Sequence, residues 1–198
     1  MLDMFFNPRA VAVIGASRTP GKLGHGVLHN IIQHGYRGAV YPINPKADEI
    51  LGLDCYSSVL AVPGPIDLAV VLIPSLNVAG ALIECGEKGV KGAIIISAGF
   101  REVGSEGWQR ERQIVGIARR YDMRLIGPNC LGIIDTMSGL NASFAVGMPR
   151  QGTIAFMSQS GALCTSVLDM ALADNVGFSH FVSLGNKADA DEITFIED

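Results

Sequence analysis

The stretch that most constrains the fold of this chain runs from Val11 to Gly26. It opens with an apolar run rich in β-branched residues, typical of a buried strand, and breaks at Gly15 into a turn of Gly, Ser, Thr and Pro. A helix is expected after the turn, with its apolar stripe at Leu23, Val27, Leu28, Ile31 and Ile32. Strand, glycine turn and helix together form an anion cradle, because free backbone N–H groups and the helix dipole converge at the first turn. A phosphate compound is therefore expected here.

The rest of the first 147 residues repeats this strand and helix alternation. Strands are expected at 39–45, 67–74, 92–97 and 124–127, and helices at 76–88 and 106–121, the latter with Trp108 on its apolar face. The stretch 46–65 is irregular and receives no assignment. Because each strand is a nearly continuous apolar run, the pattern predicts a parallel sheet covered on both faces, a Rossmann-like α/β domain. Ligands of such sheets bind at the carboxyl ends of the strands.

A second unit with the same alternation of strands and helices is expected at 148–198, after a first domain at 1–147. It has a strand at 152–157, a turn at Ser158–Gly161, a helix at 162–173, a strand at 178–184 and the start of a helix near 191. Two strands are too few to close a core, so the sequence is expected to be part of a longer protein.

Composition excludes several classes of function. The net charge is −4 and no cluster of Lys or Arg stands out, which argues against binding to nucleic acid or to a membrane surface. No apolar run reaches the roughly 18 residues of a membrane span and no signal peptide is evident, so a cytoplasmic protein is expected. The 4 cysteines are widely spaced and form no Cys/His cluster, so buried, reduced thiols and no metal site are expected.

The spacing of the glycines does not fit a nicotinamide dinucleotide. The GxGxxG fingerprint is absent, since Ser17 stands where the second glycine would be, and no acidic residue ends the second strand. Asn44, Pro45 and Lys46 stand there instead. An ammonium group suits a ribose that carries a phosphate, which describes both NADP and coenzyme A (CoA). An ordinary solvated lysine is the simpler alternative for Lys46.

Several motifs together resemble one known family, the NDP-forming acyl-CoA synthetases, which include ADP-forming acetyl-CoA synthetase and resemble the α subunit of succinyl-CoA synthetase. The resemblance covers nearly the whole chain, in order, and rests on residues 13–18, 20–24, 41–46, 97–100, 124–132, 158–161 and 183–189. It implies a CoA-binding Rossmann-like domain followed by the start of a flavodoxin-like ligase domain. The implied reaction converts acyl-CoA, phosphate and ADP into the acid, CoA and ATP through an acyl phosphate and a phosphohistidine.

The resemblance also implies the residues of the site. The positions matching the CoA site are Gly15, Ser17, Arg18, Lys22, Lys46, Ile73, Pro74, Ser97, Gly99 and Asn129. Those matching the phosphate site are Ser158, Gln159, Ser160 and Gly161. Simple strand termination is the alternative for Pro74 and Gly99, and an N-cap for Ser158 or Ser160.

No catalytic residue is assigned within the chain. The histidines His25, His29, His34 and His180 lie outside the Ser-His-Thr-Gly setting in which the family places its nucleophile, so that histidine is expected beyond residue 198. Mg-ADP or Mg-ATP is expected only with an ATP-grasp subunit or domain, in a homo- or hetero-oligomer.

Two other functions stay open. One is a non-catalytic CoA-binding module, such as the regulatory part of a protein acetyltransferase. The other is an NADP-dependent oxidoreductase. The acyl substrate is not specified by any motif.

Overall fold

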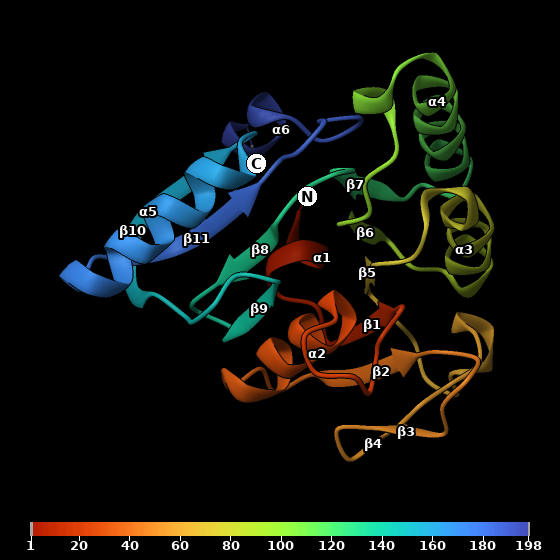
Figure 1. The fold of residues 1–198 in the computed structure, drawn as a ribbon, viewed down its shortest axis with the longest axis horizontal. Helices are drawn as coiled ribbons and strands as arrows, with labels where there is room; N and C mark the ends of the chain where they lie inside the picture. Colours follow the sequence, from red (N-terminus) through yellow and green to blue (C-terminus); the bar gives the residue numbers. More distant parts are fainter. Residues whose placement is uncertain (1, 198) are drawn as a thin grey trace.

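A computed structural model describes residues 2–197, and they are built around two sheets (Figure 1). The first sheet has five strands in the order β2-β1-β5-β6-β7, all parallel. Its members are β1 (Ala10–Ile14), β2 (Ala39–Ile43), β5 (Leu68–Val71), β6 (Gly92–Ile95) and β7 (Arg124–Ile126). The predicted parallel Rossmann-like sheet is thereby confirmed.

Helices cover both faces of this sheet, as continuous apolar strands require. On one face lie α3 (Ser75–Lys88) and α4 (Ser105–Arg120), and on the other α1 (Asp3–Phe6) and α2 (Leu23–Gln33). Because side chains alternate along a strand, Val11 and Val13 pack towards α1 and α2, whereas Ala12 and Ile14 pack towards α3 and α4.

Two predicted apolar faces are narrower than the sequence pattern indicated. Helix α2 buries Val27, Leu28 and Ile31, but Leu23 is 54% exposed and Ile32 41%. Helix α4 leaves Trp108 half exposed, under the guanidinium of Arg112 at 4.8 Å from the ring centre. These exposed side chains lie at the edges of the apolar faces of their helices. Each face contains more apolar residues than the neighbouring surface can cover.

The unassigned stretch between β2 and β5 contains short elements. Strands β3 (Glu49–Ile50) and β4 (Leu53–Asp54) form an antiparallel pair, and the 3-10 turn η1 (Val59–Ala61) follows. A second such turn, η2 (Arg101–Val103), precedes α4. Elements of two or three residues are too short for a periodic pattern to reveal them.

The second sheet has the order β10-β11-β8-β9. Its strands are β8 (Gly132–Asp135), β9 (Leu140–Ser143), β10 (Arg150–Ser158) and β11 (Gly177–Ser183), and its helices are α5 (Gly161–Asp174) and α6 (Glu192–Ile196). Strands β10 and β11 are parallel, as in the first sheet, whereas β8 and β9 run antiparallel.

The β8–β9 hairpin was missed by the sequence analysis. It lies before residue 147 but pairs with β11, so the second sheet has more strands than the two expected for 148–198. The two four-residue strands follow β7 almost directly, without an intervening helix to mark a new element. The domain boundary after residue 147 stays a prediction.

One hydrophobic cluster joins the two sheets. It combines Val13 and Val70 of the first sheet with Ile133, Val182 and Leu184 at or beside the second. In the described part of the chain, no helix combines the length and apolar character needed to cross a membrane.

Candidate functional site

The glycine turn is shaped by close backbone contacts. Gly15 has φ +95°, and a Cβ there would lie 2.7 Å from the carbonyl oxygen of Leu72. A Cβ on Gly24 would lie 2.0 Å from the carbonyl oxygen of Gly15. Glycine at these two positions therefore allows α2 to pack directly against the end of β1, where the cradle was predicted.

Two cations come together beside this turn. The Arg18 guanidinium donates to the backbone carbonyl of Lys46 at 3.1 Å, which joins the glycine turn to the loop after β2. Asn44 supports the same contact, because its amide donates to the Ala16 carbonyl at 2.8 Å and accepts from the Lys46 N–H at 2.9 Å. Both cationic residues are exposed. The arrangement can present two positive charges to an anionic group in solvent.

Ser17 and Lys22 occupy different places in the turn. The Ser17 hydroxyl accepts from the Thr19 N–H at 3.1 Å and so stabilises the bend of the loop. Lys22 is exposed at the N-cap position of α2 and makes no side-chain cap there. Lys22 thus brings a positive charge to the residue that precedes the helix N-terminus, where an anion is favoured.

A cavity of about 660 Å³ opens at the switch point of the first sheet. The chain leaves β1 on one side for β2 and returns on the other side to β5, and Gly15, Asn44, Ile73 and Pro74 line the space between. This is the place where open parallel sheets bind ligands.

A second cavity, of about 530 Å³, lies between the two sheets. Ile73, Pro74, Ser97 and Asn129 line it from the first sheet, and Gln159 and Gly161 from the loop after β10. Ile73 and Pro74 line both cavities, so the two spaces share a wall. Together they can hold one extended ligand, with one end at the glycine turn and the loop after β2 and the other end near α5.

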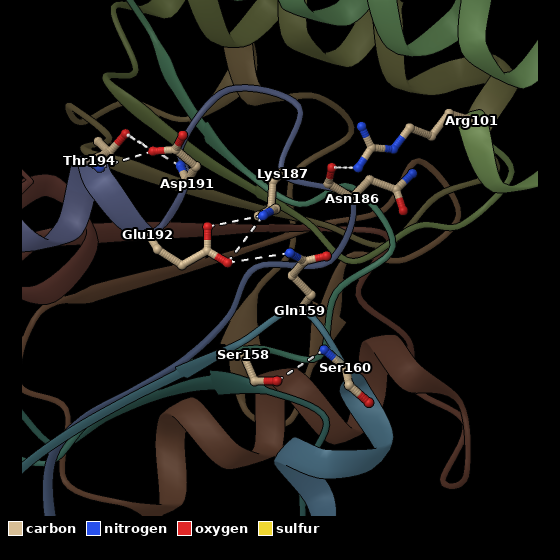
Figure 2. Close-up of polar contacts among 9 residues, drawn as sticks. All are labelled: Arg101, Ser158, Gln159, Ser160, Asn186, Lys187, Asp191, Glu192 and Thr194. Atoms are coloured by element: carbon tan, nitrogen blue, oxygen red, sulfur yellow. Dashed lines mark hydrogen bonds and ion pairs between the residues drawn. The ribbon is translucent and has the colours of Figure 1, made fainter.

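The loop Ser158–Gly161 forms the N-terminus of α5 (Figure 2). The Ser160 hydroxyl accepts from the Leu163 N–H at 3.2 Å, and the Ser158 hydroxyl accepts from the Ser160 N–H at 3.1 Å. The N-cap interpretation of Ser160 is thereby confirmed. Of the predicted phosphate residues, Gln159 and Gly161 face the cavity, and the two serines organise the turn.

Lys187 lies beside this loop on the segment that follows β11. Its ammonium group contacts both carboxylate oxygens of Glu192, at 3.0 and 3.1 Å, and Gln159 donates to the same carboxylate at 3.4 Å. Figure 2 shows Lys187 and Gln159 converging on the Glu192 carboxylate, above Ser158 and Ser160 in this view. Sequence reasoning assigned no role to Lys187 or Glu192.

Gly99 lies outside both cavities. Its N–H donates to Glu102 at 2.5 Å, as does the Phe100 N–H at 3.0 Å, and its carbonyl accepts from Arg110 at 2.9 Å. Partial burial disfavours the charge on Glu102, but these bonds and one from Asn186 outweigh it and lower the pKa of the carboxyl below its usual range. The backbone donor of Gly99 is thus already satisfied within the protein.

Burial and position argue against a nucleophilic role for the thiol and imidazole groups near the site. Burial raises the pKa of the Cys130 thiol, which lines the second cavity, to about 12. His25 and His29 stack with ring centres 6.1 Å apart and line a separate cavity with residues 144–147. None of these three residues is therefore assigned to catalysis.

Sequence reasoning missed several apolar residues of the second cavity, among them Leu23, Leu131 and Phe144. Leu23 was assigned to the buried stripe of α2, whereas its exposed side chain faces the cavity. Leu131 and Phe144 flank the β8–β9 hairpin, which the sequence did not reveal. No local pattern distinguishes these residues from core residues.

The parallel sheet, the glycine turn and the two strand-end cavities define an α/β protein of the Rossmann-like class, with a candidate ligand site at its switch point. Residues 9–136 match the CoA binding domain family, and residues 151–198 match the succinyl-CoA ligase like flavodoxin domain. The chain belongs to the CoA binding domain family and corresponds to the CoA-binding portion of ADP-forming acetyl-CoA synthetases.

Three relatives illustrate this assignment. The ADP-forming acetate–CoA ligase of Methanocaldococcus jannaschii is 52% identical, over 96% of this chain and 26% of its own length. The subunit alpha of ADP-forming acetate–CoA ligase II of Pyrococcus furiosus is 49% identical, over 100% of this chain and 43% of its own length. The structure of Ca. Korarchaeum cryptofilum dinucleotide forming acetyl-coenzyme A synthetase 1 with phosphate and ADP has a TM-score of 0.96 at 44% identity, and covers 100% of this chain and 42% of that one. The chain thus spans less than half the length of these relatives.

Proposed function

We propose that this chain binds CoA or acyl-CoA and phosphate for an ADP-forming acyl-CoA synthetase. The observation that carries the proposal is the pair of adjoining cavities, which lead from Gly15 and Asn44, on the glycine turn and the loop after β2, to the N-terminus of α5. Arg18 and Lys46 belong to the same two segments, which their hydrogen bond joins. CoA has a matching shape, with a phosphorylated ribose at one end and a thiol at the other. In this proposal Lys46 and Arg18 contact the ribose phosphate, and Gly15, Ser17 and Lys22 contact the diphosphate.

The thiol-bearing arm of CoA would follow the wall formed by Ile73 and Pro74 into the second cavity. That cavity has the mixed lining which such an arm requires, since Leu23 and Phe144 are apolar and Ser97 and Asn129 are polar. The thiol end would lie near Asn129 and close to Gln159 and Gly161. These two residues belong to the loop Ser158–Gly161, the proposed phosphate loop. Gly99 would act indirectly, through the loop that carries Ser97.

The phosphate loop would hold inorganic phosphate against the thioester. The backbone N–H groups at the start of α5 and the helix dipole favour an anion there. In the proposed step a phosphate oxygen attacks the thioester carbonyl, a C–O bond forms, the C–S bond breaks, and the proton of the phosphate passes to the CoA thiolate. The products are an acyl phosphate and CoA.

The remaining chemistry would use groups outside this chain. We propose that a histidine elsewhere in the protein accepts the phosphoryl group, because a neutral imidazole is nucleophilic near pH 7 and no histidine lines the two described cavities. An ATP-grasp subunit or domain would bind Mg-ADP and receive the phosphoryl group. The Pyrococcus furiosus relative is named as a subunit alpha, which supports a partner subunit.

Calorimetric titration tests the CoA assignment. We expect CoA to bind more tightly than dephospho-CoA or NADP, and the Lys46→Ala variant to lose the preference for the 3′-phosphate, at a cost of about tenfold in CoA affinity. The matched control is Lys91→Ala, because Lys91 is also exposed but lies at the amino end of β6, where it pairs with Asp122 at 3.5 Å.

Two outcomes would contradict the assignment in different ways. Equal affinity of the unsubstituted protein for CoA and dephospho-CoA would remove the role given to Lys46. Tighter binding of NADP than of CoA would overturn the proposed ligand itself.

A further inference from the structure

A buried asparagine connects the CoA side of the site to the phosphate side. Asn186 follows β11, on the segment that also carries Lys187, and only 7% of it is exposed. Its side-chain nitrogen donates to Glu102 at 2.7 Å and to Glu111 at 2.8 Å. Glu102 belongs to η2 and Glu111 to α4, so both partners come from the first sheet's side of the molecule.

Arg101 completes this contact. Its guanidinium approaches Glu111 to 3.6 Å and donates to the backbone carbonyl of Asn186, as Figure 2 shows. The segment is also held by its backbone, since the Asn186 N–H donates to the Pro128 carbonyl at 2.8 Å. A Cβ on Gly185 would lie 2.6 Å from the Asn129 carbonyl oxygen, so only glycine permits this approach.

The two carboxylates fix the orientation of the Asn186 amide. A carboxylate oxygen only accepts hydrogen bonds, and the amide nitrogen has two hydrogens to donate, one for each carboxylate. Rotating the amide by half a turn would place its oxygen against two carboxylates with no hydrogen between them, which is strongly unfavourable at a buried position. The Asn186 side-chain oxygen must therefore face the other way.

That oxygen accepts from the side-chain nitrogen of Asn129 at 3.4 Å. Because the Asn186 oxygen cannot donate, Asn129 must present its nitrogen to it and turn its own side-chain oxygen elsewhere. Asn129 is exposed and lines the second cavity, and its N–H is held by the Ser97 carbonyl at 3.0 Å. The acidic pair thus dictates the orientation of a polar group at the cavity wall through two successive amides.

We propose that Asn186 is a positioning residue that holds the Asn129 amide so that its oxygen accepts a hydrogen bond from the thiol-bearing arm of CoA. This inference rests on the proposed binding of CoA in the second cavity. In this arrangement Glu102 and Glu111 orient Asn186. Binding of the CoA arm then depends on the segment that follows β11 of the second sheet.

The test compares CoA with adenosine 3′,5′-bisphosphate, which lacks the thiol-bearing arm. We expect Asn186→Ala to weaken CoA binding by about tenfold, the equivalent of one oriented hydrogen bond, and to change binding of the bisphosphate by less than twofold. If Asn186 had only a structural role, its substitution would lower the affinity for both ligands by similar factors. Unchanged affinity for CoA, or an equal loss for both ligands, would overturn the inference.

A double-mutant cycle adds a second measurement. Asn129→Ala should cost about as much as Asn186→Ala, and the double variant should cost little more than either, since both remove the same hydrogen bond. Additive losses would overturn the positioning role. If Asn186→Ala does not fold, the double variant Glu102→Gln/Glu111→Gln carries the test, because two neutral amides no longer force the orientation of Asn186. The same selective loss of CoA affinity is expected.

Failure of this inference differs from failure of the proposed function. If the unsubstituted protein does not bind CoA, the function is wrong. If it binds CoA and the variants bind it equally well, only the role of Asn186 is wrong.

Discussion

At the scale of single residues, the site depends on hydrogen bonds that hold charged side chains at loop junctions. Glu102 is the clearest case, because one of its carboxylate oxygens accepts from the Gly99 and Phe100 N–H groups and the other from Asn186. These bonds favour the ionised form more than partial burial opposes it, so the pKa of Glu102 lies below its usual range. The ionised carboxylate therefore stabilises the folded state.

Glu102→Gln should lower stability in a pH-dependent way. Since the pKa of Glu102 is lower in the folded state, its contribution is present above its unfolded pKa of about 4.3 and is lost as the pH falls through the folded value. We expect a loss of less than about 1 kcal/mol in the free energy of unfolding at pH 7, shrinking towards zero near pH 3. Urea unfolding at both pH values measures it.

The matched control is Glu106→Gln. Glu106 lies on α4 nearby, but its side chain is 87% exposed and pairs with Arg110 at 3.8 Å. Such a surface pair contributes little. A Glu102→Gln difference that grows as the pH falls would contradict the argument.

At the scale of secondary structure elements, α5 shows how a structural cap and a ligand site share one turn. Ser160 satisfies a free N–H of the helix, as N-cap residues do, and Gln159 and Gly161 of the same turn face the cavity. The cap and the proposed phosphate site are therefore compatible, because a helix has several free N–H groups at its start.

Two substitutions at Ser160 separate the cap from the proposed phosphate site. Ser160→Ala should lower the free energy of unfolding by about 1 kcal/mol, because the cap is lost. Ser160→Asp should keep the stability, since aspartate caps helices equally well, but should weaken binding of inorganic phosphate at least tenfold by repulsion. Urea unfolding and phosphate titration measure the two effects. Unimpaired phosphate binding by Ser160→Asp would place the phosphate elsewhere.

At the scale of the whole molecule, the two sheets share a hydrophobic core and a polar connection. Leu184, which is fully buried, belongs to the same cluster as Val13 and Val70 of the first sheet. Asp189 accepts from the Arg124 side chain and from the Leu125 N–H, both at 2.9 Å, and so ties the segment after β11 to β7. Separating the two sheets would expose the apolar side chains of this cluster to water.

The described residues should therefore unfold in one cooperative transition. The chain has 1 tryptophan, Trp108 on α4, whose fluorescence reports on the first sheet, whereas far-UV circular dichroism reports on both. We expect the two signals to give the same urea midpoint. Leu184→Ala should lower both midpoints together, because truncating a buried leucine typically lowers the free energy of unfolding by roughly 2–5 kcal/mol. A fluorescence midpoint that does not move would show that the sheets unfold independently.

The parallel sheet, and the sheet edge that carries the candidate site, follow from the amino-acid sequence alone. Apolar runs separated by glycine turns and amphipathic helices are local patterns. Because Pro74, Ser97 and Asn129 each follow a predicted strand, these patterns also place them at the carboxyl edge of the sheet. The tertiary structure alone decided that the β8–β9 hairpin joins β11, that Phe144 lines the cavity, and that Asn186 meets Glu111. Those contacts join segments far apart in the chain, and their partners are chosen by packing and hydrogen bonding in three dimensions, which leaves no periodic signal in the sequence.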